Sequence, residues 1–203
     1  MYVVLLTGGL ASGKDCVGAM LKKRGATLLD LDLIAKEEQL RPEVLASLQE
    51  EFGDDIVDAF GNLDRKLLAQ RAFVGDESAR RLNAICWPPV RRRIQSLLLE
   101  VRGLPKSEHA LIVIEIPLLA EAPDFLNLND EVISVVADEK LRMARAVARG
   151  MAPEDAHRRL LLQASDQERA AISDTVFENN GSLEELQTQV DTWFEARRTS
   201  GLF

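Results

Sequence analysis

The sequence predicts an α/β fold with a parallel β-sheet flanked by helices. Short apolar runs alternate with helical patterns along the chain, which is typical of a doubly wound sheet. A glycine-rich turn joins the first apolar run to the first helical pattern. Acidic and polar residues follow several of the apolar runs. Because ligands bind at the carboxyl ends of the strands in such sheets, we expect these residues to gather at one edge.

The expected strands are short. The first covers residues 2–6, "YVVLL", and the second covers residues 26–32, "ATLLDLD", which ends in two acids. Between them, residues 13–24 have a helical pattern that stops at Gly25. This strand, turn, helix and strand make a βαβ unit, so we expect parallel pairing. The other three strands are expected over residues 110–116, 131–137 and 174–179.

Helical patterns fill the rest of the chain. Residues 37–102 contain no clear strand, so we expect a helical insertion between the second and third strands, over the mouth of the sheet. Later helices are expected over residues 138–150, 152–172 and 182–198, the last with a capping box of Ser182 and Glu185. We predict a single domain over residues 1–203. Its core is 1–36 and 108–203, its insertion is about 37–107, and its lid is about 139–165.

Composition excludes several classes of function. The net charge of −8 and the absence of a long basic patch argue against nucleic-acid binding. The two cysteines, Cys16 and Cys86, have no metal-binding spacing and fit a reducing cytoplasm. The apolar run at the N-terminus is too short for a signal peptide or a membrane span. We therefore expect a cytoplasmic protein that binds no membrane, and the sequence points to no obligate protein partner.

The stretch "TGGLASGKDC", residues 7–16, has the spacing of a phosphate-binding loop. Gly8, four further residues, Gly13 and Lys14 stand between an expected strand and an expected helix, as this motif requires. Glycines let the backbone amides face phosphate oxygens, and the helix N-terminus adds partial positive charge. Lys14 should reach the outer phosphates of a bound nucleotide. The expected nucleotide-binding residues are Gly8, Gly9, Ala11, Ser12, Gly13, Lys14, Asp15 and Cys16.

Asp15 stands where this loop normally has a serine or threonine whose hydroxyl binds Mg²⁺. A carboxylate is also a good Mg²⁺ ligand, so Asp15 is our candidate metal ligand. Two alternatives stay open at this point. Asp15 could instead turn away and cap the helix, or it could mark an impaired site.

Further motifs resemble the dephospho-coenzyme A kinase family, in the same order along the chain. "LLDLDLIAK" is similar to the family's Asp-Ala-Asp strand end, and "FGDDIVDAFGNLDRKLLAQRAF" to its insertion signature. "IPLLAE" is similar to Pro-Leu-Leu-x-Glu, Arg145 and Arg149 to two lid arginines followed by Gln163, and "NNGS" to the last strand end. The resemblance runs from about Val3 to Trp193. It implies a P-loop kinase fold with a five-stranded parallel sheet, a helical substrate-binding insertion and a helical lid.

The resemblance implies that ATP, with Mg²⁺, phosphorylates the ribose 3′-hydroxyl of dephospho-CoA, the last step of coenzyme A synthesis. Four departures from the family pattern stand against it: Asp15, Phe60, Trp87 and a lid turn, "RGMAP", that is one residue short. Two alternatives therefore stay open. One is another small-molecule or nucleotide kinase on the same scaffold, and the other is a nucleotide-binding homologue with impaired catalysis.

The resemblance also implies roles for single residues. Lys14, Arg145 and Arg149 would hold phosphates, and Asp32 would act as a general base with Asp30 as its rival. The alternatives are ordinary turn acids and a solvated lid helix. Asn180 and Gly181 would border the adenine, unless they form an ordinary turn. The expected acceptor-binding residues are Asp30, Asp32, Arg65, Pro117, Leu118, Leu119 and Glu121.

Overall fold

The structure, a computed structural model, describes residues 1–104, 111–117, 119–120 and 125–203. The chain divides into two compact units. The first unit contains Met1–Asp30 and Val101–Phe203, and the second contains Leu31–Glu100. The second unit overlaps the insertion that we predicted over residues 37–107, and its role in acceptor binding stays a prediction.

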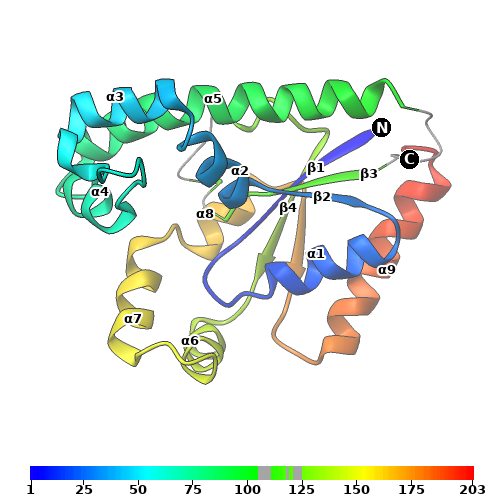
Figure 1. The fold of residues 1–203 in the computed structure, drawn as a ribbon. Helices are drawn as coiled ribbons and strands as arrows, with labels where there is room; N and C mark the ends of the chain where they lie inside the picture. Colours follow the sequence, from blue (N-terminus) through cyan, green and yellow to red (C-terminus); the bar gives the residue numbers. More distant parts are fainter. Residues whose placement is uncertain (105–110, 118, 121–124) are drawn as a thin grey trace. The chain divides into compact units, whose positions relative to one another are not determined.

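The first unit contains the predicted parallel sheet (Figure 1). Its strands are β1 (Tyr2–Gly8), β2 (Thr27–Asp30), β3 (Leu111–Glu115), β4 (Glu131–Val136) and β5 (Thr175–Glu178). The order is β2-β3-β1-β4-β5, and each neighbouring pair is parallel. The central strand β1 is buried from Val3 to Gly8, as expected for a strand covered on both faces. The predicted α/β fold is confirmed.

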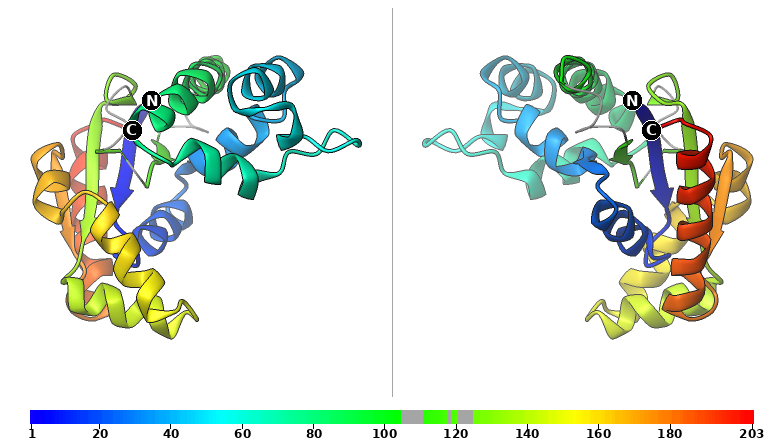
Figure 2. Two further views of the ribbon diagram at one scale, coloured as in Figure 1. Left: turned by 90° about the vertical axis from the view of Figure 1, so that its left-hand side faces the viewer. Right: turned by 90° about the vertical axis from the view of Figure 1, so that its right-hand side faces the viewer.

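Helices of the first unit pack on the sheet and on one another. Helices α1 (Lys14–Lys23) and α9 (Leu183–Thr199) pack against each other and share an apolar core with the sheet. Helices α6 (Glu139–Ala148) and α7 (Pro153–Leu162) pack against each other, as Figure 2 shows. Helix α8 (Asp166–Ala171) contacts β1 and β4. The loop that joins β1 to α1 begins at the C-terminal end of the central strand of the sheet.

The second unit is helical. It contains α2 (Leu31–Glu38), α3 (Pro42–Phe52), the short 3₁₀ helix η1 (Asp54–Ile56), α4 (Arg65–Ala72) and most of α5 (Asp76–Arg102). Buried side chains of α3, η1, α4 and α5 form an apolar cluster of their own, which includes Leu48, Phe52 and Leu68. Asp64 caps α4 by accepting hydrogen bonds from the amides of Lys66 and Leu67. This cluster gives the unit its own core.

The structure corrects two of the predicted elements. The second strand ends at Asp30 rather than at residue 32, because its neighbour β3 ends at Glu115, with which Asp30 pairs. The chain continues directly into α2, so Asp32 lies in the first turn of a helix. The helix predicted over residues 152–172 is divided into α7 and α8. A capping box of Ser165 and Glu168 begins α8, a signal that the sequence carried.

A buried carboxylate ties the first unit together at the start of β4. Glu131 accepts hydrogen bonds from Tyr2 Oη (2.8 Å), Thr175 Oγ1 (2.5 Å), Trp193 Nε1 (2.8 Å) and Arg197 Nη2 (2.7 Å). Burial alone would raise the pKa of Glu131, but the hydrogen bonds from Arg197, Thr175, Trp193 and Tyr2 outweigh it and lower the pKa. The ionised form is therefore the one that stabilises the fold.

We expect Glu131→Gln to lower the free energy of unfolding by about 3 kcal/mol at neutral pH, since it leaves the Arg197 guanidinium without its buried partner. A lowered folded-state pKa adds stability above the ordinary value of 4.5, which is lost as pH falls through the folded pKa. The difference from the wild type should therefore shrink in acid. Urea unfolding of both proteins, at neutral pH and in acid below the ordinary pKa of 4.5, measures this difference in the free energy of unfolding. The control is Glu195→Gln, which breaks an exposed ion pair with Arg198 on α9, the helix that carries Arg197. It should change the free energy of unfolding little.

Candidate phosphate-binding site

The loop between β1 and α1 has the backbone of a phosphate-binding turn. Gly13 has φ of +104° and forms the N-cap of α1, so Lys14 is the first residue of the helix. A Cβ at Gly13 would collide with the side-chain amide of Asn179. Ala11 also has a positive φ, of 56°, and no other described residue except glycine does so. The loop therefore depends on glycine at position 13 and holds an alanine in a costly conformation at position 11.

The loop lines a small hollow. Residues 8–15 enclose about 220 Å³ together with Pro117, Arg149 and Gln163. Pro117 follows β3, and its carbonyl oxygen accepts a hydrogen bond from Thr7 Oγ1 (3.3 Å). Arg149 is exposed at the end of α6. The structure thus brings Pro117 and Arg149, both predicted site residues, to the loop from distant parts of the chain.

Two carboxylates hold the Lys14 ammonium at this hollow. Lys14 Nζ lies 2.9 Å from Asp15 Oδ1 and 3.5 Å from Glu115 Oε1. Burial would lower the pKa of Lys14, but hydrogen bonds and charge from Asp15 and Glu115 outweigh it and raise the pKa. Burial raises the pKa of Glu115, and Lys14 only partly offsets this because Asp15 and Asp30 add negative charge. Lys14 is therefore a firmly charged cation placed for phosphate.

Asp15 does not cap the helix. Its side chain is 77% exposed and pairs with Lys14, while Gly13, the N-cap of α1, has no side-chain cap. The capping interpretation of Asp15 was therefore wrong. The metal-ligand and impaired-site interpretations both remain, because a carboxylate on the lysine suits either.

Asn179, which the sequence analysis missed, braces the loop from β5. Its Nδ2 donates to Ser12 O (2.7 Å), and Arg145 Nη2 donates to Asn179 O (3.0 Å). The next residue, Asn180, is predicted with Gly181 to border the adenine, and that role stays a prediction. Its Oδ1 accepts a hydrogen bond from Asp138 N (2.7 Å). Gly181 is exposed beside Glu185. The pair "NN" carried the signal, but the sequence could not say which asparagine faces the loop.

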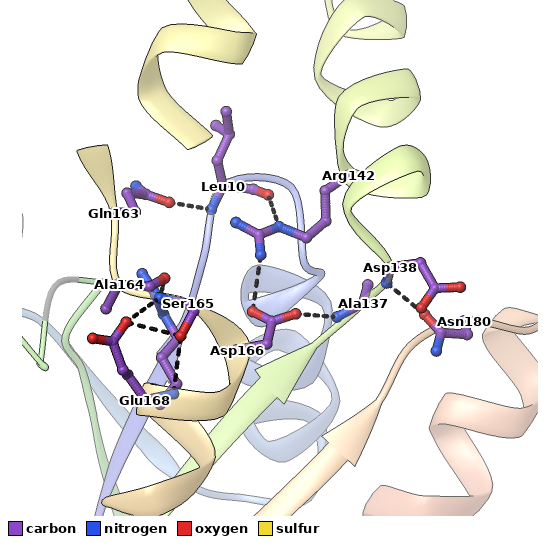
Figure 3. Close-up of polar contacts among 11 residues, drawn as sticks. Leu10, Ala137, Asp138, Arg142, Gln163, Ala164, Ser165, Asp166, Glu168 and Asn180 are labelled. Atoms are coloured by element: carbon purple, nitrogen blue, oxygen red, sulfur yellow. Dashed lines mark hydrogen bonds and ion pairs between the residues drawn. The ribbon is translucent and has the colours of Figure 1, made fainter. Parts of the chain in front are cut away.

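Arg142, also missed, is buried against the loop (Figure 3). Its Nε donates to Leu10 O (3.0 Å), and its Nη1 lies 2.8 Å from Asp166 Oδ1. Arg142 lies three residues before Arg145, so the two share a face of α6. That spacing was the signal that could have found it. Arg145 is half-buried and donates to the carbonyl of Asn179, whose side chain contacts the loop.

Comparison with known proteins identifies the family of this chain. The family model for dephospho-CoA kinase matches residues 2–185. The chain belongs to the dephospho-CoA kinase family. A dephospho-CoA kinase of Enterococcus faecalis is 36% identical, with 95% of this chain and 96% of that protein covered. One of Mycobacterium tuberculosis (strain H37Rv) is 42% identical over 95% of this chain, which spans only 47% of that protein.

Solved structures agree on the fold. The crystal structure of TT1252 from Thermus thermophilus is 31% identical and has a TM-score of 0.79, with 96% of this chain and 97% of that one covered. The dephospho-CoA kinase from Campylobacter jejuni has a TM-score of 0.62 and covers 96% of each chain. Its identity of 21% supports the shared fold alone.

The acceptor-binding residues that the dephospho-CoA kinase resemblance implied lie in several places. Asp30 is exposed and pairs with Glu115 in the strand register, so it stands at the carboxyl edge of the sheet. Leu119 is fully buried. Asp32 is exposed and Arg65 donates to Lys36 O (3.0 Å), both in the second unit. Leu118 and Glu121 lie outside the described residues. The acceptor roles of all these residues stay predictions.

The carboxylates beside Lys14 fit a Mg²⁺ ion that is held mainly by nucleotide. Among the described residues, no group of three or more His, Cys, Asp or Glu side chains is placed to hold a metal by itself. Mg²⁺ in kinases usually takes one or two carboxylates together with phosphate oxygens and water. Asp15 and Glu115 could supply these carboxylates.

As to membranes, none of the helices described is both long and apolar enough to span one.

Proposed function

We propose that this protein is a dephospho-CoA kinase, which transfers the γ-phosphoryl group of ATP to the ribose 3′-hydroxyl of dephospho-CoA. The observation that carries the proposal is the loop itself: Lys14, half-buried and charged, stands at a hollow lined by loop residues 8–15 in a chain of this family. The small-molecule partner would be dephospho-CoA. Two free cysteines, Cys16 and Cys86, support a cytoplasmic location.

The proposed reaction is an in-line displacement. A bond forms between the ribose 3′-oxygen and the γ-phosphorus, while the bond from the γ-phosphorus to the β,γ-bridging oxygen breaks. The hydroxyl proton passes to a carboxylate, and ADP leaves. Such reactions need positioning and neutralised charge more than covalent help from the protein.

Each proposed role follows from a side chain of this chain. Lys14 and the loop amides would bind the β- and γ-phosphates, and Arg149 at the same hollow would bind phosphate as charge develops. Arg145 would act from the same helix. Asp32, from α2, would accept the hydroxyl proton, with Asp30 as its rival. Mg²⁺, when bound, would neutralise phosphate charge, and Asp15 is the proposed ligand.

A coupled assay of ADP release tests the proposal. The protein is given ATP with dephospho-CoA or, separately, with nucleoside monophosphates, each with and without Mg²⁺. We expect turnover with dephospho-CoA that requires Mg²⁺. Turnover with a nucleoside monophosphate, but none with dephospho-CoA, would identify a different kinase on the same scaffold.

A second candidate is a nucleotide-binding homologue that has lost catalysis. The contact of Asp15 with Lys14 favours it, because this carboxylate partly neutralises the phosphate-binding cation before nucleotide arrives. Measurable ATP binding in a separate titration, together with no ADP release when ATP and dephospho-CoA are both supplied, would support this second candidate.

We expect Asp15→Ser to keep or raise turnover, since serine restores the hydroxyl that this loop normally offers to Mg²⁺. Removing the carboxylate also frees the Lys14 ammonium from its partner at 2.9 Å. Mg²⁺ titrations of kcat/KM in both proteins measure the effect. Loss of all Mg²⁺-dependent turnover in the variant would instead make the Asp15 carboxylate essential.

A further inference from the structure

Two side chains hold the main chain of Leu10 within the phosphate-binding loop (Figure 3). Gln163 Oε1 accepts a hydrogen bond from Leu10 N (2.8 Å). Arg142 Nε donates to Leu10 O (3.0 Å). One side chain comes from α6 and the other from the residue that follows α7. Both peptide groups of Leu10 are therefore fixed by parts of the chain more than a hundred residues away.

Asp166 in turn fixes Arg142. The Arg142 side chain is only 6% exposed, and its Nη1 lies 2.8 Å from Asp166 Oδ1. The other oxygen, Asp166 Oδ2, accepts from Ala137 N (3.4 Å). A guanidinium this buried requires a charged partner, because an unpaired buried charge is strongly unfavourable. Asp166 therefore sets the direction in which Arg142 meets the loop.

The residue after Leu10 explains why the loop needs this support. Ala11 has φ of 56°, in the left-handed region that alanine avoids because its Cβ approaches the backbone. The carbonyl that Arg142 holds belongs to the peptide bond between Leu10 and Ala11. Strained residues persist only where their surroundings fix them. The hydrogen bond of Arg142 acts on the bond next to this strained torsion.

Gly9 supplies a second contact between Arg142 and the loop. A Cβ at Gly9 would overlap Arg142 Nη2, and it would lie 2.8 Å from Cζ. The guanidinium thus packs directly on the backbone of Gly9, where only glycine leaves room for it. Arg142 therefore contacts the loop at two successive residues before Ala11.

We propose that Arg142, Asp166 and Gln163 form a positioning device, here called the Leu10 anchor, that holds the phosphate-binding loop in its strained conformation. The anchor makes the loop competent for nucleotide through side chains of α6, of α8 and of the residue after α7, in addition to the loop's own glycines. None of its three members acts as a catalytic group. The inference rests on the proposed function only for its nucleotide-binding test.

Hydrogen exchange of the protein without nucleotide tests the anchor directly. Ser12 N donates to Gly9 O (3.1 Å), and Leu10 N is bonded to Gln163, so both amides report on the loop. We expect Arg142→Gln and Asp166→Asn to speed their exchange about tenfold, while β4 and α9 stay protected. The matched control is Arg158→Gln, which breaks an exposed ion pair with Asp155 on α7 and should leave the loop unchanged.

Glycine at position 11 separates an anchor from a merely structural ion pair. Ala11→Gly relieves the strain, so the loop should then need the anchor less. We expect Arg142→Gln to accelerate loop exchange clearly less in the Ala11→Gly background than in the wild type. An equal effect in both backgrounds would overturn the proposal, as would Arg142→Gln and Asp166→Asn variants whose Tm falls while loop exchange is unchanged.

Calorimetric titration with Mg²⁺ and ADP measures the consequence for the site. We expect binding about tenfold weaker in Arg142→Gln and Asp166→Asn, with partial recovery in the Arg142→Gln, Ala11→Gly double variant, because a loop that is not preorganised must be ordered by its ligand. Unchanged affinity in both single variants would contradict a positioning role. A wild-type chain that binds no ADP would refute the proposed function, and loop exchange would still decide the anchor.

Discussion

Replacing Lys14 with methionine should lower kcat/KM for ATP and dephospho-CoA by at least about a thousandfold, because electrostatic stabilisation dominates phosphoryl transfer. Methionine keeps most of the length of the side chain and removes its charge. The coupled ADP-release assay measures the loss. Lys22→Met, on an exposed position in the last turn of the same helix, is the matched control and should keep wild-type turnover.

The pH dependence of Lys14 follows from its raised pKa. Burial opposes the charge, but Asp15 and Glu115 raise the pKa above the ordinary value of 10.5. A raised pKa contributes stability that is complete below the unfolded value and is lost as pH rises through the folded one. We therefore expect no decline in wild-type activity from Lys14 deprotonation below about pH 10.

If Lys14→Met kept a tenth or more of wild-type activity, Lys14 would lose its proposed role.

Asp32→Asn should lower kcat by a factor of about 10² to 10⁴, the usual contribution of a general base. Asparagine has nearly the same shape as aspartate but cannot accept the hydroxyl proton. Affinity for ADP should change little, because the proposed role of Asp32 concerns the acceptor. Rate measurements under saturating ATP and dephospho-CoA, with a separate ADP titration, distinguish the two effects.

Asp30→Asn is the matched comparison for this test. Asp30 is exposed at the end of β2, two residues from Asp32, and is the rival candidate for the base. A large loss in Asp32→Asn with a small one in Asp30→Asn supports our assignment. The reverse pattern would transfer the role to Asp30, and an unchanged rate in Asp32→Asn would remove Asp32 as the base.

Local patterns were enough to predict the strands and the loop. Runs such as "YVVLL" and "EVISVVA" are short, apolar and β-branched, so they indicate buried parallel strands whatever surrounds them. The spacing of Gly8, Gly13 and Lys14 states a backbone requirement directly, since only certain residues adopt these torsions. Where prediction failed, at residues 31–32, the strand ended because its neighbour ended, a fact that no local pattern contains.

The sequence was less informative about which side chains support the loop. Asn179 and Asn180 are adjacent and chemically identical, and only the end of β5 decides that Asn179 reaches Ser12 O. Arg142 and Arg145 lie on one helical face, yet Arg142 is the one that contacts the loop backbone. These assignments depend on how helices pack on the sheet, to within a few ångströms.

By itself, then, the sequence determined the α/β class, the phosphate-binding loop and the family, because each follows from residue types at fixed spacings along the chain. The tertiary structure decided that Glu115 shares Lys14 with Asp15, that Asp15 does not cap α1, and that Arg142 with Asp166 holds Leu10 beside a strained Ala11. The physical reason is the same in each case. Ion pairs and hydrogen bonds depend on distance in space. Glu115 reaches Lys14 only when β3 pairs with β1, and Arg142 reaches both Leu10 and Asp166 only when α6 and α8 lie beside the loop after β1.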